Sequence, residues 1–147
     1  MAFFKFSTLA LALIAGMSFA AQADDHAAHV WPEGAVPYII SPADGATVKN
    51  PVTVIFGLKG MGVAPAGIDK PKTGHHHLLI DTDLPSGEDL DYAIAADEQH
   101  VHFGGGQTET TIELTPGKHT LQLLMGDANH VPHNPPLASE KITVTVE

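Results

Sequence analysis

Residues 108–125 read TETTIELTPGKHTLQLLM and carry the clearest structural signal in the chain. Apolar and polar residues alternate from 108 to 114 and again from 119 to 125, so each half has one apolar face. The Pro116-Gly117 pair between the halves is a tight-turn signal. A period of two belongs to strands and not to helices, so this part of the chain is predicted to form two β-strands. In the second strand the shared face carries His119, Leu121, Leu123 and Met125.

Short apolar runs separated by turn residues continue on both sides of this region. Residues 36–40 end at the turn cluster 41–45, residues 52–58 alternate cleanly, and residues 142–146 close the chain with the same period. Residues 75–81 form a further predicted strand after the Gly/Pro-rich loop 59–74. The acidic segment 84–99 is expected to hold a short helix or only a loop. No segment shows a sustained helical period.

This pattern predicts an all-β fold, an antiparallel immunoglobulin-like β-sandwich. A small barrel is the alternative. The 147 residues are too few for two domains of ordinary size. We therefore expect a single sandwich domain over residues 38–147, preceded by a flexible N-terminal segment over residues 24–37.

The first 23 residues have the form of an export signal. Lys5 supplies the positive charge, residues 9–15 are a short apolar run, and Ala21-Gln22-Ala23 is an A-x-A cleavage signal. Because the apolar run is too short for a stable membrane anchor, we expect cleavage before Asp24. The mature protein is then periplasmic or secreted, without a membrane span.

The composition excludes several classes of protein. The chain contains no Cys and no Arg and has a formal charge of -10. Disulfide scaffolds, thiolate zinc sites and iron–sulfur clusters all need Cys. Nucleic-acid binding needs a basic surface, so no nucleic-acid partner is expected.

Histidine is the unusual component: the chain has 10, and they come in tight groups. On a strand, the first and third residues of a His-x-His pair share a face and lie roughly 7 Å apart at Cα, close enough to reach one cation. Neutral imidazole suits copper and zinc ions. The candidate metal ligands are His75, His77, His100, His102, His130 and His133.

The remaining histidines have simpler interpretations. His76, on the opposite face of its strand, and His119, at the start of a strand, are expected to be structural. His26 and His29 lie near the N-terminal end of the mature chain. Met125 occupies an apolar strand face and is expected to pack in the core, whereas Met61, in a loop, could add a thioether ligand.

Four segments together resemble a known bacterial family of secreted domains, the domain-of-unknown-function family numbered 4399. They are residues 60–67 (GMGVAPAG), 73–81 (TGHHHLLID), 102–109 (HFGGGQTE) and 116–123 (PGKHTLQL) with His130-Val131-Pro132-His133. The similarity covers about residues 51–146. It implies a small exported β-domain and supplies no catalytic residues, so the metal hypothesis rests on the histidines themselves.

Three functions are compatible with these observations. The first is an exported metal-binding protein that buffers or delivers copper or zinc. The second is a structural or interaction module that contacts another component of the cell envelope, such as a polysaccharide or a membrane protein. The third is a metal-dependent enzyme, in which Glu109 or Asp81 would serve as a base beside a metal-bound water.

Overall fold

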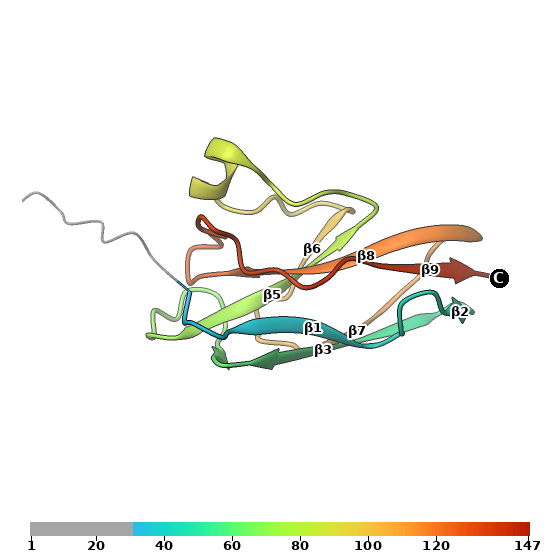
Figure 1. Cartoon of the computed structure of the whole chain (residues 1–147), viewed down its shortest axis with the longest axis horizontal. Helices are drawn as coiled ribbons and strands as arrows, with labels where there is room; N and C mark the ends of the chain where they lie inside the picture. Colours follow the sequence, from blue (N-terminus) through green and yellow to red (C-terminus); the bar gives the residue numbers. More distant parts are fainter. Residues whose placement is uncertain (1–30) are drawn as a thin grey trace, which may run out of the picture.

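The computed structural model describes residues 31–147, which form a two-layered β-sandwich (Figure 1). The predicted signal peptide (1–23), residues 24–30 of the predicted N-terminal segment, and His26 and His29 lie outside the described residues. The elements in chain order are β1 (Val36–Ser41), β2 (Thr47–Val48), β3 (Val52–Lys59), β4 (Gly62–Val63), β5 (Thr73–Ile80), the 3₁₀ helix η1 (Gly87–Asp91), β6 (His100–His102), β7 (Glu109–Ile112), β8 (Gly117–Gly126) and β9 (Ile142–Val146). The first strand therefore begins at Val36.

The smaller sheet has the strand order β1-β3-β7, and the larger sheet has the order β2-β9-β8-β5-β4 with β6 also paired to β5. Because the chain forms two separate sheets, the predicted all-β sandwich is confirmed and the barrel alternative is not needed. One detail of the prediction is corrected. The short strands β2 and β4 pair in parallel with β9 and β5, whereas the other pairs are antiparallel.

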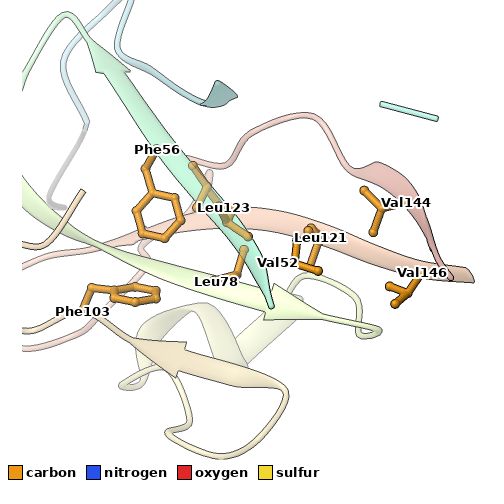
Figure 2. Close-up of a cluster of buried hydrophobic side chains, with 9 residues drawn as sticks. Val52, Phe56, Leu78, Phe103, Leu121, Leu123, Val144 and Val146 are labelled. Carbon is orange, nitrogen blue, oxygen red and sulfur yellow. The ribbon is translucent and has the colours of Figure 1, made fainter. Parts of the chain in front are cut away.

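The core between the sheets follows from the alternation in the sequence. On β3, Val52, Val54 and Phe56 are buried, as the period of two predicts. They pack against apolar residues of β5, β8 and β9, and Figure 2 shows these side chains meeting between the layers. Burial of this apolar surface is the main source of stability in a domain of this kind.

The central strand β5 is buried on both of its faces. His76 and Leu78 point into the core, where the ring of His76 lies 5.2 Å from that of Phe56. Residues 75, 77 and 79 point to the opposite face. Figure 1 shows the segment with η1 on that side of the larger sheet, away from β1 and β3. This covering segment creates a second buried space outside the sandwich core.

The expectations for His76 and Met125 are consistent with this arrangement. Both side chains are fully buried, and the two residues are cross-strand partners on β5 and β8. Within residues 31–147, no helix combines the length and the apolar character needed to cross a membrane.

Candidate metal centre

The histidine cluster starts with two rings on β5. His75 and His77 are two residues apart on one strand, so they share its outer face. Strand β6 pairs antiparallel with β5 and places His102 directly opposite His77. Cross-strand partners share a face, so His102 joins the same group. Three imidazoles are therefore fixed by the backbone of two paired strands.

The fourth ring comes from the loop that follows β8. His130 has a φ of 70°, an uncommon conformation for a residue with a side chain. Asp127 holds this loop: its Oδ1 accepts hydrogen bonds from the backbone N–H groups of Asn129 (2.7 Å) and Val131 (2.9 Å). The His130 carbonyl in turn accepts a hydrogen bond from the Ile94 N–H at 2.9 Å, which docks the loop on the covering segment.

These four rings lie close together. The ring centres of His75, His77 and His102 form a nearly equilateral triangle, and His130 lies over it. The six distances between ring centres are 4.9 Å (His75–His77), 5.0 Å (His75–His102), 5.1 Å (His77–His102), 5.0 Å (His75–His130), 6.2 Å (His77–His130) and 4.7 Å (His102–His130). In addition, one ring nitrogen from each of His75, His77 and His102 lies within 4.8 Å of the other two.

Two rings of the cluster are fully buried, and three of the four carry buried nitrogens without a partner. His75 and His77 are 0% and 1% exposed. Both ring nitrogens of His75, Nδ1 of His77 and Nε2 of His102 are buried and make no hydrogen bond within the described residues. An unsatisfied buried polar group costs about 1–3 kcal/mol, so native proteins rarely keep several of them together without a role.

Burial also sets the charge state of these rings. Desolvation, with a smaller contribution from the neighbouring histidines, lowers the pKa of His75 to about 4 and that of His77 to about 3. The pKa of His102 is lowered for the same two reasons. All three rings are therefore neutral at physiological pH, and neutral imidazole is the form that binds metal ions.

Two glycines leave room for the rings. A Cβ on Gly104 would lie 2.3 Å from Cε1 of His102, and a Cβ on Gly126 would lie 2.8 Å from Cε1 of His77. Neither glycine has a positive φ. Their small size, and not their backbone freedom, is what the cluster requires.

A Gly104→Ala substitution is therefore expected to displace the His102 ring and weaken metal binding by about tenfold, because ligand position controls affinity. Gly105→Ala is the matched control, since its new Cβ would meet only the end of the flexible Gln107 side chain, at 3.1 Å. Metal titrations of both variants measure the difference. Equal affinities would contradict the assigned role of His102.

Two of the six predicted ligands lie outside this group. His100 is opposite Leu79 on β5, and its Nδ1 is 2.8 Å from Oδ1 of Asp97. It lines a separate hollow of about 300 Å³ beside Tyr92. His133 bonds Oδ2 of Asp127 through Nε2 at 2.9 Å, so it supports the loop that carries His130.

The residues considered as catalytic bases are also placed elsewhere. Asp81 follows the far end of β5 and pairs with His119, with 2.6 Å between Oδ2 and Nδ1. This contact raises the pKa of His119. Glu109 lies on β7 in the other sheet.

Asp127 and Gly126 also shape the cluster, and the sequence analysis did not single them out. The Asp-x-Asn spacing, typical of a side chain that caps its own loop, is the signal that could have identified Asp127.

The comparisons with known proteins agree with the resemblance noted in the sequence. Residues 54–147 match a family described as "Domain of unknown function (DUF4399)". The chain belongs to the DUF4399 family. All four converging histidines fall inside the matched region. No curated protein and no solved structure matches the chain.

Proposed function

We propose that this DUF4399 protein is an exported metal-binding protein that holds one copper or zinc ion and buffers or delivers it. The observation that carries the proposal is the convergence of His75, His77, His102 and His130. These rings come from two strands and a loop, and His75, His77 and His102 present buried nitrogens without hydrogen-bond partners. A bound cation would satisfy one nitrogen of each ring.

The surroundings of the cluster favour a cation. The carboxylate of Asp127 lies close enough to His75 to favour positive charge on that ring. Asp127 itself stays ionised because hydrogen bonds from Val131, His133 and Asn129 lower its pKa despite desolvation. A fixed negative charge beside the imidazole ligands offsets part of the cost of burying a dication.

The two other functions explain fewer of these observations. An interaction module of the cell envelope does not need several buried imidazoles that lack hydrogen bonds. An enzyme that uses Asp81 or Glu109 as its base would need one of these carboxylates beside the cluster. Asp81 is instead engaged by His119, and Glu109 belongs to the opposite sheet.

Calorimetric titration of the purified, metal-free protein with Cu(II) and with Zn(II) tests the proposal. We expect one tight equivalent per chain near neutral pH, with a competing chelator present to suppress weak binding by surface histidines. Ligand at 100 times its dissociation constant stabilises the fold by about 2.7 kcal/mol, so the unfolding temperature should rise with metal concentration. If the protein bound less than half an equivalent of each ion per chain, and its unfolding temperature did not rise, the proposal would be overturned.

A further inference from the structure

We propose that the cluster is a closed, four-coordinate tetrahedral site that takes a zinc-type divalent cation through four imidazoles. This inference rests on the metal-binding function proposed above and identifies the class of ion. It also implies that the site stores or transfers the ion, because no coordination position is left for a substrate.

The four ring centres are arranged as a tetrahedron and not as a square. Four points in a square have two diagonals about 1.4 times as long as the sides, which is the pattern that a square-planar Cu(II) site would give. Here the longest separation is 6.2 Å, between His77 and His130, but the complementary pair His75–His102 is only 5.0 Å apart. The ring centres therefore lie at the corners of a slightly stretched tetrahedron.

The size of this tetrahedron matches that of a metal ion bound by four imidazoles. With edges near 5 Å its centre lies about 3 Å from each ring centre, and an imidazole bound through nitrogen at about 2.0–2.1 Å also holds its ring centre about 3 Å from the metal. His75, His77 and His102 already have ring nitrogens within 4.8 Å of one another, and His130 has to turn a nitrogen toward them to complete the site.

The donor chemistry narrows the choice of ion. Calcium and magnesium prefer oxygen ligands, and the nearby Asp127 carboxylate already accepts hydrogen bonds from its own loop and from His133. Sulfur ligands favour Cu(I), whereas all four side chains of the cluster are imidazoles, and Met125 points to the opposite face of the sheet. Four imidazole nitrogens in tetrahedral array suit Zn(II), which has no geometric preference of its own.

The origin of the four ligands suggests how the ion leaves. His75, His77 and His102 are fixed by the pairing of β5 with β6. His130 lies on a loop outside the sheet, and the hydrogen bonds that hold this loop, to Asp127 and to Ile94, are separate from the strand pairing. The loop can therefore withdraw without disturbing the sheet. Opening at this corner would expose a three-histidine site from which the ion could be passed on.

Cobalt(II) is the probe for this geometry, because four-coordinate Co(II) absorbs visible light much more strongly than six-coordinate Co(II). We expect intense bands that saturate at one equivalent, disappear when Zn(II) is added, and do not change with excess azide, because the site is closed. In His130→Gly the bands should become sensitive to azide, since a position opens for an external ligand. Glycine suits the positive φ at this position and keeps the loop conformation.

Two further variants on β6 serve as controls. His102→Ala removes another corner from a partly exposed edge strand and should give the same azide response, whereas His100→Ala on the same strand should behave as the parent protein. One equivalent of Co(II) with a weak six-coordinate spectrum, or an azide response in the parent protein, would overturn the closed tetrahedral site and leave metal binding intact. Absence of any bound metal would overturn both proposals.

Discussion

Replacement of His77 by Leu is expected to abolish tight metal binding and at the same time stabilise the metal-free protein. His77 is 1% exposed, and its Nδ1 has no hydrogen-bond partner. Leucine has a similar volume and no polar atom to desolvate. Replacing an unsatisfied buried polar group by an apolar one removes a cost of about 1–3 kcal/mol. If His77 served only the fold, the same substitution would lower the stability of the metal-free protein.

Two measurements on His77→Leu test this expectation. The metal affinity should fall by at least about 100-fold, the upper end of the loss seen even for groups that only support a ligand. The free energy of unfolding of the metal-free protein should rise by about 1–2 kcal/mol in urea titrations. Trp31 is the only tryptophan and is buried against the loop that carries His130, so its fluorescence can follow unfolding.

His119→Leu is the matched control. His119 is paired with Asp81 and donates a hydrogen bond from Nε2 to the Thr115 carbonyl, so its loss should destabilise the protein. The metal affinity of this variant should equal that of the parent protein, because His119 lies outside the converging group. If His77→Leu kept its affinity and lost stability in the same way as His119→Leu, the cluster would be structural.

The sequence was sufficient to predict the strands and the faces they present. The alternation in residues 52–58 and 119–125 predicted which side chains of β3 and β8 enter the core, and the His-x-His spacing correctly put His75 and His77 on one face. The strands β2 and β4, of two residues each, and β6, of three residues, were not predicted. Segments that short show no clear period, and their pairing depends on the strands beside them.

The choice between His100 and His102 depended on information that is absent from local sequence. Both residues share a face of β6, and spacing alone treats them equally. The register between β5 and β6 sets His102 opposite His77 and His100 opposite Leu79. Register is a property of two strands together, and a shift along β5 would have changed which histidine reaches the cluster.

The same limit applies to His130 and His133 in the loop after β8. Both have positive φ values, 70° and 60°, and a loop has no period that assigns its side chains to a face. The hydrogen bonds of Asp127 to Asn129, Val131 and His133 fold this loop and send His130 inward. The hydrogen bonds of one carboxylate therefore determine which of the two histidines lies in the cluster.

The metal-free protein is expected to lose a large part of its stability as the pH falls from about 6.5 toward 4. Burial lowers the pKa of His75 and His76 to about 4 and that of His77 to about 3. In the unfolded chain these rings titrate near 6.5, so between the two values the unfolded state binds more protons than the folded state. Stability is then fully present above pH 6.5 and falls with decreasing pH.

The expected loss is large relative to the stability of a domain. A shift of about 2.5 pH units corresponds to about 3 kcal/mol for one ring, and a whole domain is typically stable by about 5–15 kcal/mol. The carboxylates do not explain a loss in this window. The lowered pKa of Asp127 and of Asp81 removes stability only as the pH falls below about 3.8. The raised pKa of His119 acts in the opposite direction, since its contribution is fully present below pH 6.5.

Urea unfolding of the metal-free protein at a series of pH values, followed by Trp31 fluorescence, measures this dependence. The slope of the unfolding free energy against pH gives the number of protons taken up, and we expect two to three near pH 5. His77→Leu should lower that number by about one, because one titrating ring is gone. Saturating Zn(II) should move the loss of stability to lower pH, since the ion holds the rings in their neutral form. A flat profile between pH 6.5 and 4 would mean that water or protons reach the cluster freely in the folded protein, and the buried site would have to be abandoned.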